Sequence, residues 1–196
     1  MIRLLSNGTN APPAIRLDGE HVFLRPPQPK DWRDWAELRA LSRDFLTPWE
    51  PTWPPDALSR PAFLRRLRRE AVQWREDESY GFLVFQQGTE VIVGGISLNN
   101  VRRGVAQAGT LGYWVGMPFA RRGFIAQATR LVCDFSFQQL ALHRVEAACL
   151  PTNEASRGLL EKVGFEQEGY ARGYLRIDGV WRDHVLYAML REDWRA

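Results

Sequence analysis

Cysteine, long apolar runs and internal repeats are all scarce or missing in this chain of 196 residues. The two cysteines, Cys133 and Cys149, lie in apolar segments and lack metal-ligand spacing, so we expect buried reduced thiols and no metal site. No apolar run approaches the roughly 20 residues of a membrane span, and residues 1–18 lack the apolar stretch of a signal peptide. These absences predict a cytoplasmic protein without a membrane partner.

The excess of positive over negative charge is also small, since the net charge is only +3. The densest basic cluster comprises Arg60, Arg65, Arg66, Arg68 and Arg69. Phe63, Leu67 and Trp74 recur at helical spacing in the same segment, which places the arginines on the opposite side of a helix. A solvated helix face is therefore favoured over a nucleic-acid site, and a non-catalytic module that binds RNA or a ribosome is kept as an alternative.

Hydrophobic periodicity predicts one domain with alternating strands and helices. Residues 1–17 are expected to form a flexible leader, and residues 18–196 the domain. Short apolar segments predict strands at residues 21–25, 80–85, 91–98, 107–115, 144–149, 170–177 and 180–190. Segments with a period of 3.6 predict helices that begin near residues 31, 61, 122 and 153.

The order of these segments predicts how the sheet is connected. Strands 80–85, 91–98 and 107–115 follow one another through short turns, which implies an antiparallel meander. Strands 107–115 and 144–149 are joined by a helix and should pair in parallel. We therefore expect a mixed α/β fold: a twisted, mostly antiparallel sheet of about seven strands with one parallel pair, flanked by about four helices.

One strand-to-helix junction carries the features of an anion site. The strand ends in Tyr113-Trp114-Val115, and the helix opens with the turn Arg121-Arg122-Gly123-Phe124-Ile125-Ala126. The first N–H groups of a helix have no partner within the helix, and the helix dipole adds to their attraction for anions. Gly123 would let a phosphate approach the backbone without a Cβ in the way. Taken alone the turn is a weak signal, because many helices begin with arginine and glycine.

A second helix, after the next strand, strengthens this interpretation. Asn153 suits an N-cap, and Gly164 suits a helix terminator, although both also have ordinary structural explanations. Ser156 falls in the first turn, where its hydroxyl could face a ligand. An anion turn followed by an Asn-capped helix that ends in Gly164-Phe165 is far more specific than either part.

Together these segments resemble the GNAT superfamily of acetyl-coenzyme A-dependent N-acetyltransferases, and within it the RimJ/RimL type that acts on ribosomal-protein N-termini. The resemblance covers residues 17–196 and rests mainly on Leu111-Gly112-Tyr113-Trp114, Arg122-Gly123-Phe124, His143-Arg144-Val145-Glu146-Ala147, Pro151-Thr152-Asn153-Glu154-Ala155-Ser156 and Leu160-Glu161-Lys162-Val163-Gly164-Phe165. The turn departs from the usual Gln/Arg-x-x-Gly-x-Gly/Ala pattern. Ala120 and Ile125 occupy its outer positions, so only Gly123 matches.

The resemblance implies direct attack of an amine on the acetyl thioester, with acetyl-coenzyme A as the donor and no metal. The tyrosine that many members use as general acid would fall at Leu160, so Ser156 is the candidate acid for the departing thiolate. Glu50 and Glu146 are candidate bases, with substrate recognition and ion pairing as their respective alternative roles. The implied cofactor-binding set is Tyr113, Trp114, Val115, Arg121, Arg122, Gly123, Phe124, Ile125, Ala126, Asn153 and Ser156.

The acceptor is less well determined than the donor. The RimJ/RimL resemblance implies a protein N-terminus, such as that of a ribosomal protein. A small amine, such as a polyamine, an antibiotic or an amino-acid derivative, is the alternative, because both acceptors would use the same donor site. The sequence also leaves open whether the protein is a monomer or a homodimer.

Overall fold

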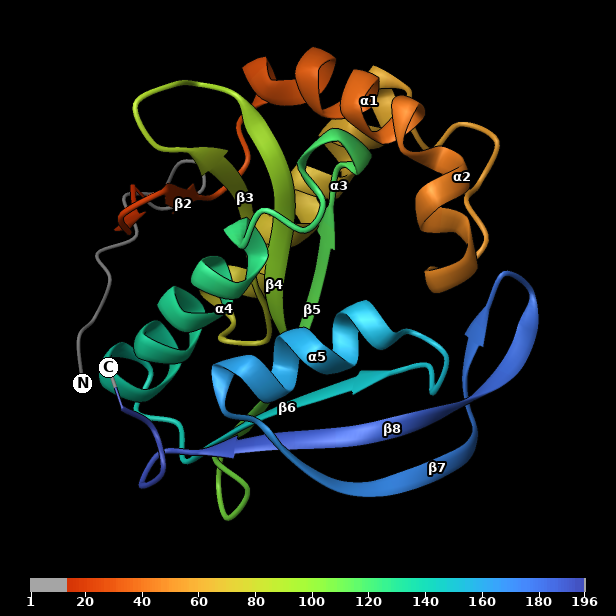
Figure 1. Ribbon diagram of the computed structural model, residues 1–196. Coiled ribbons are helices and arrows are strands. Elements are labelled where there is room, and N and C mark those ends of the chain that lie inside the picture. The colour runs from red at the N-terminus through yellow and green to blue at the C-terminus, as the bar shows by residue number, and fades with distance from the viewer. Residues whose placement is uncertain (1–13, 196) are drawn as a thin grey trace.

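A computed structural model describes residues 14–195 as one mixed sheet with helices on both faces (Figure 1). The described residues form eight strands in the order β1-β2-β3-β4-β5-β6-β8-β7. Neighbouring strands pair antiparallel, except that β5 and β6 pair in parallel. The strands are β1 (Leu17–Asp18), β2 (Val22–Arg25), β3 (Tyr80–Gln86), β4 (Ile92–Arg102), β5 (Ala108–Val115), β6 (Arg144–Cys149), β7 (Glu166–Ile177) and β8 (Val180–Leu190).

The helices occur in two groups along the described chain. One group precedes β3 and the other flanks β6. The α-helices are α1 (Trp32–Leu41), α2 (Arg43–Leu46), α3 (Arg60–Arg75), α4 (Phe124–Asp134) and α5 (Glu154–Val163). Short 3-10 helices occur at η1 (Pro29–Asp31), η2 (Thr47–Trp49) and η3 (Met117–Phe119), and the π-helical turn Phe135–Gln139 extends α4.

The predicted fold class is confirmed, including its single parallel pair. The sheet has one strand more than expected because Leu17 and Asp18 pair with β2 as a two-residue strand. β7 begins at Glu166, ahead of the predicted start near residue 170. The first residues of β7 are polar and exposed, so they carry no apolar alternation that could mark a strand.

The beginning of the chain is described only in part. Residues 1–13 of the predicted leader lie outside the described residues. Ile15 packs against the core, and Leu17, which is buried, already belongs to β1. The body of the structure therefore includes the last residues of the segment that we assigned to the leader.

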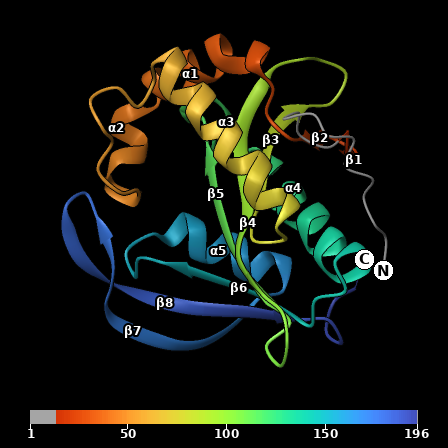
Figure 2. The same cartoon turned by 180° about the vertical axis from the view of Figure 1, so that it is seen from behind.

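Each face of the sheet has its own helix layer and its own apolar cluster. α4 and α5 lie on the face that is nearer in Figure 1, where Val132 and Leu160 are fully buried. α3 covers the other face, as Figure 2 shows from behind. There Trp35 of α1 and Phe63 of α3 pack with their ring centroids 4.9 Å apart. The predicted amphipathic pattern of α3 is confirmed, since its buried residues are Phe63, Ala71 and Trp74.

The helix that follows β6 begins and ends where the sequence indicates. The Asn153 side chain accepts a hydrogen bond from the Ser156 N–H, with a distance of 3.0 Å between Oδ1 and N. This is the expected N-cap geometry. The helix ends at Gly164, whose φ of 106° lies in the left-handed region that favours glycine. The cap fixes the position of the first turn of α5, which carries Ser156.

The parallel pair β5–β6 separates partway along its length. Its last paired residues are Leu111 and Ala147. Beyond them β5 continues to Val115 in partnership with β4, while β6 continues in partnership with β8. The segment Gly112–Val115 therefore has strand pairing on one side only, which leaves backbone groups available to a ligand between the two strands.

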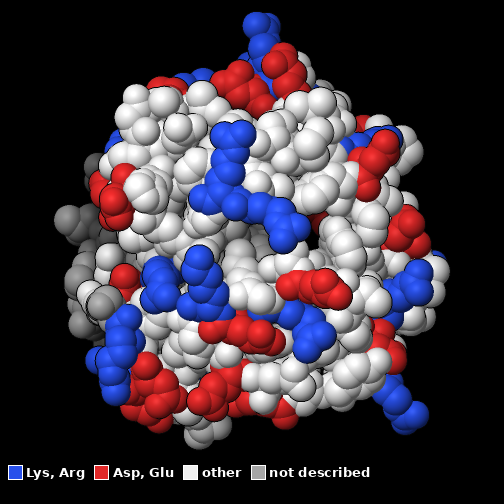
Figure 3. Space-filling model, in the orientation of Figure 1, with Lys and Arg blue, Asp and Glu red and all other residues white. Residues whose placement is uncertain are grey.

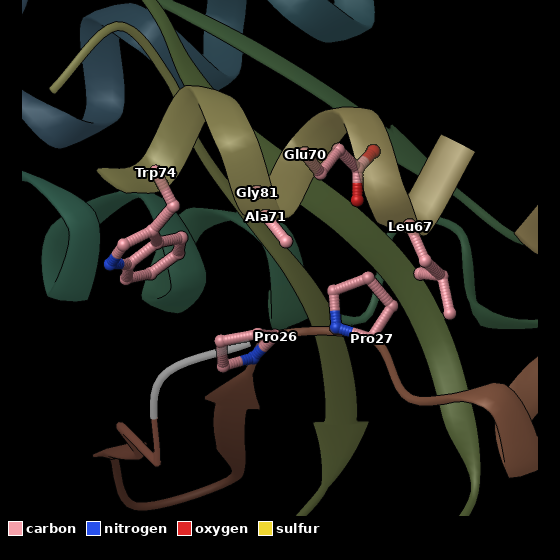
Figure 4. Close-up of a pocket in the computed structure, with 7 residues that line it drawn as sticks. All are labelled: Pro26, Pro27, Leu67, Glu70, Ala71, Trp74 and Gly81. Carbon is pink, nitrogen blue, oxygen red and sulfur yellow. The ribbon is translucent and has the colours of Figure 1, made fainter. Parts of the chain in front are cut away.

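A small cavity between α3 and β3 is not the functional site. Leu67, Glu70 and Trp74 of α3 border it on one side, and Pro26 and Pro27 on the other (Figure 4). Its volume is about 10 Å³, which is room for about one water molecule.

No helix among residues 14–195 has both the length and the apolar character that crossing a bilayer requires.

Candidate active site

The turn before α4 is shaped as an anion-binding backbone. Gly123 is the N-cap with φ of 81°, and Arg121 has φ of 62°. In the described chain, no side chain caps this end of α4, and its first turn contains no acidic residue. The first N–H groups of the helix are therefore free to face a negatively charged group, and the helix dipole favours one there.

The side chains of the turn divide into exposed cations and a buried anchor. Arg121 and Arg122 are exposed, whereas Ile125 is buried and can offer a ligand only its backbone N–H. Phe124 is half-buried and meets Phe119 edge to face, with 6.4 Å between ring centroids. Figure 3 shows Lys and Arg side chains above and to the left of a hollow in this face. The turn thus combines backbone donors with nearby positive charge.

Tyr113 and Ser156 meet on the face of the sheet that carries α4 and α5. The Tyr113 hydroxyl lies 2.8 Å from Ser156 Oγ and 3.5 Å from the Ser156 carbonyl oxygen. Burial raises the pKa of Tyr113, and the hydrogen bond to Ser156 opposes this only in part. Burial also raises the pKa of the Cys149 thiol, with the Ser156 hydrogen bond acting in the opposite direction. A hydroxyl pair and a neutral thiol therefore lie beside the opening between β5 and β6.

Trp114 points to the other face, because successive side chains of a strand alternate. The guanidinium carbon of Arg39 lies 4.8 Å from the Trp114 ring and 4.2 Å from the Trp53 ring. Arg39 donates two hydrogen bonds to Glu50, of 2.7 and 2.6 Å, and Trp53 Nε1 donates a third of 2.8 Å. The Asp178 N–H donates to the Glu50 carbonyl oxygen at 2.9 Å. We call Arg39, Glu50, Trp53 and Trp114 the acceptor-side wall.

The acceptor-side wall includes a residue that sequence reasoning missed. Arg39 lies in α1, while Glu50 and Trp53 follow η2 and Trp114 lies in β5. No local pattern marks Arg39, since its partners are far away along the chain. The Arg39 and Glu50 side chains are only 12% and 18% exposed. Burying either charge alone would be costly, and the ion pair between them offsets this cost.

The fold places Glu146 on the opposite face of the sheet from Ser156. On β6 it alternates with Val145 and Ala147, which are buried under α4 and α5, so its side chain points to the opposite face. It accepts hydrogen bonds from Arg102 at 2.5 Å and from Arg144 at 3.0 Å. Its position in the paired part of β6 also places it away from the opening that starts after Ala147.

Two other predicted positions have simple structural roles. Leu160 is fully buried in the core, so the position of the family tyrosine offers no hydroxyl here. In the basic segment of α3, Arg65 pairs with Asp56 and Arg66 pairs with Glu70, at 2.6 and 2.5 Å. Among the described residues, no group of three or more His, Cys, Asp or Glu side chains is placed to hold a metal ion.

The residues that are present fit the phosphates and the arm of a coenzyme A thioester. A Cβ built on Gly123 would meet no atom within 4 Å, so the turn is open to an incoming group. The segment Gly112–Val115 lies beside the opening with its backbone unpaired on that side. Ser156 stands at the far end of this path, on α5. Phosphates at the α4 N-terminus and a pantetheine arm along β5 would satisfy these groups. When bound, the donor supplies an acetyl thioester that an amine can attack.

Comparison with known proteins agrees with this arrangement. Residues 21–166 match the model of the acetyltransferase (GNAT) domain. The [ribosomal protein uS5]-alanine N-acetyltransferase of Escherichia coli is 34% identical over 183 residues, which cover 93% of this chain and 94% of that protein.

Two solved structures are similar over nearly the whole chain. The ribosomal-protein-S5-alanine acetyltransferase of Vibrio fischeri has a TM-score of 0.84 at 29% identity and covers 93% of this chain and all of its own. RimJ of Mycobacterium smegmatis in complex with CoA-disulfide also has a TM-score of 0.84, at 31% identity, and covers 89% of this chain and 84% of its own. The chain belongs to the GNAT family of acetyltransferases, is of RimJ/RimL type, and acts as an N-acetyltransferase with acetyl-coenzyme A as its donor.

Proposed function

We propose that this N-acetyltransferase acetylates the α-amino group of a protein N-terminus, and that its substrate is a ribosomal protein. The observation that carries the proposal is the end-to-end similarity to the Escherichia coli enzyme that is named for an alanine of ribosomal protein uS5. The match extends over 93% of this chain, so it includes the acceptor side as well as the donor turn.

The charges of the acceptor-side wall support a polypeptide acceptor over a polyamine. A polyamine carries several ammonium groups and requires carboxylates that are free to bind them. Glu50 already accepts hydrogen bonds from Arg39 and Trp53, and Glu146 from two arginines. What the wall presents instead is the surface of two indole rings around a neutralised ion pair, which suits an apolar first side chain.

The chemistry needs one proton to leave the nitrogen, which solvent water at the opening can accept, and one to reach the sulfur. The carbon–nitrogen bond forms as the carbon–sulfur bond breaks, so no covalent intermediate with the protein is required. We propose that the Ser156 hydroxyl donates to the departing sulfur, and that Asn153 keeps it in place by capping α5. Holding amine and thioester in line at the opening between β5 and β6 supplies much of the rate enhancement.

A dedicated carboxylate base is not required by this arrangement. A protein α-amino group has a pKa of about 7.7–8.0, so a substantial fraction is neutral near pH 8. Glu50 and Glu146 remain predicted bases, although each has a standing ion pair that proton uptake would weaken. We expect kcat/KM to rise with pH as the acceptor amine loses its proton, and to level off above about pH 8.

Two panels of acceptors test the proposal. One contains peptides with the N-terminal sequences of ribosomal proteins, and the other contains polyamines, aminoglycosides and free amino acids. We expect acetylated peptides by mass spectrometry, with the acetyl group on the α-amine. Turnover of small amines without turnover of any peptide would overturn the proposal.

A cytoplasmic location and a monomeric or homodimeric state remain predictions. Gel filtration with light scattering checks the oligomeric state.

A further inference from the structure

The hydroxyl pair formed by Tyr113 and Ser156 has an internal direction. Besides lying 2.8 Å from Ser156 Oγ, the Tyr113 hydroxyl lies 3.5 Å from the Ser156 carbonyl oxygen, which can only accept. The 2.8 Å contact by itself allows either hydroxyl to donate, whereas the contact with the carbonyl oxygen requires Tyr113 to be the donor. A phenol is also a stronger donor than an alkyl hydroxyl, since its pKa of about 10 is much lower.

This direction determines where the Ser156 hydrogen points. A hydroxyl has one hydrogen to donate, so a Ser156 that accepts from Tyr113 keeps its own hydrogen for another acceptor, for which the Cys149 sulfur and the departing sulfur of the donor would compete. Burial raises the pKa of Tyr113, so the phenol remains protonated and can donate throughout the neutral and mildly alkaline range. Burial of the Cys149 thiol nearby likewise leaves that group neutral.

Building on the proposed function, we propose that Tyr113 is a positioning residue that orients the Ser156 hydroxyl toward the departing sulfur. Tyr113 belongs to the strand that borders the opening, and Ser156 belongs to the helix on its far side. The hydrogen bond between them crosses from β5 to α5. It holds Ser156 in one rotamer, with its hydrogen directed into the opening.

Tyr187 of β8 provides a control that bonds to the same helix, α5. Its hydroxyl donates to Glu161 Oε1 at 3.0 Å, and Arg157 Nε approaches it at 3.4 Å. Like Tyr113, it is a phenol of the sheet bonded to α5, but it is more deeply buried than the half-buried Tyr113 and its partners are not Ser156. Tyr187→Phe therefore removes a hydrogen bond to α5 while leaving both partners of the Tyr113–Ser156 contact in place.

Steady-state kinetics of Tyr113→Phe, Ser156→Ala, the double variant and Tyr187→Phe test the inference. We expect kcat to fall about tenfold in Tyr113→Phe, because one hydrogen bond that orients the acid is lost. The KM for acetyl-coenzyme A should stay within about twofold of the wild type. The double variant should be no slower than Ser156→Ala, and Tyr187→Phe should keep the wild-type kcat. Unchanged kcat in Tyr113→Phe, or losses that multiply in the double variant, would overturn the inference.

Titration of the bound coenzyme A thiol gives a readout that needs no acceptor. Thiolate absorbance in the ultraviolet, measured against the free protein, reports the pKa of that thiol. A hydroxyl directed at sulfur favours the thiolate, so we expect a lowered thiol pKa in the wild type and Tyr187→Phe, and a higher value in Tyr113→Phe and Ser156→Ala.

The two measurements separate the inference from the proposed function. A Tyr113-dependent thiol pKa with no peptide turnover would refute the peptide acceptor and support the inference. Peptide turnover with the same thiol pKa in wild type and Tyr113→Phe would support the peptide acceptor and refute the inference. Calorimetry that detects no coenzyme A binding would refute both.

Discussion

Replacing Gly123 with valine tests whether the α4 turn holds the donor through its backbone. Gly123 has φ of 81°, a conformation that costs a residue with a Cβ about 1–2 kcal/mol, and more when the side chain is β-branched. No atom lies within 4 Å of the added Cβ, so strain rather than a clash is the cost. For a domain of this size each kcal/mol lowers the melting temperature by about 2–4 °C. The fold should therefore survive.

The cost to binding should be larger than the cost to folding. Relief of the strain rotates the peptide groups that open α4, and these groups are the proposed phosphate donors. A hydrogen bond to a charged group contributes about 1.5–3 kcal/mol. Loss of one such bond should weaken acetyl-coenzyme A binding about ten- to hundredfold, and loss of two should abolish measurable binding. Isothermal calorimetry measures the affinity, and circular dichroism measures the melting temperature.

Gly104→Val is the control for strain alone. Gly104 lies in the turn between β4 and β5, has φ of 63° and also has no atom within 4 Å of an added Cβ. The two variants should lose similar stability, but only Gly123→Val should lose affinity. Wild-type affinity in Gly123→Val, or an equal loss of affinity in both variants, would refute the assignment of the donor turn.

Three further predictions concern named side chains. Arg121→Ala and Arg122→Ala should each weaken acetyl-coenzyme A binding several-fold at low salt and less at high salt, because exposed charges are screened; calorimetry at two ionic strengths checks this. Arg39→Met should cost about 3–5 kcal/mol of folding free energy by leaving the buried Glu50 unpaired, and adding Glu50→Gln should restore part of it; denaturant unfolding measures both. Ser156→Ala should lower kcat and leave acetyl-coenzyme A affinity unchanged, which stopped-flow kinetics and calorimetry separate.

Much of the fold could be predicted because its signals are local. The helix cap at Asn153, the terminator at Gly164 and the periodicity of α3 each involve residues within a few positions of one another. The parallel pair followed from the helix that joins its two strands. The two strand boundaries that were missed, at Leu17 and Glu166, lie in segments too short or too polar for a periodic signal.

The donor turn and the catalytic groups differ in how far the sequence could define them. The turn is continuous, so its position before the helix and its need for Gly123 were predictable, and the structure adds that Gly123 has a positive φ. The Tyr113–Ser156 contact joins a strand to a helix 43 positions later, and Arg39 joins three separate segments. Such contacts exist only after folding. For the same reason the sequence could not tell that Glu50 is already paired with Arg39, whereas ion pairing was the alternative role that we had assigned to Glu146.

Two adjacent side chains of β5 serve opposite sides of the site. Tyr113 faces α5, and Trp114 is part of the acceptor-side wall on the other face. Gly94 and Gly95 of β4 lie directly against Trp114, where any Cβ would overlap it, so both positions require glycine for Trp114 to keep its place. Because Tyr113 and Ser156 lie on the opposite face, we expect substitutions around Trp114 to alter the choice of amine more than the handling of the thioester.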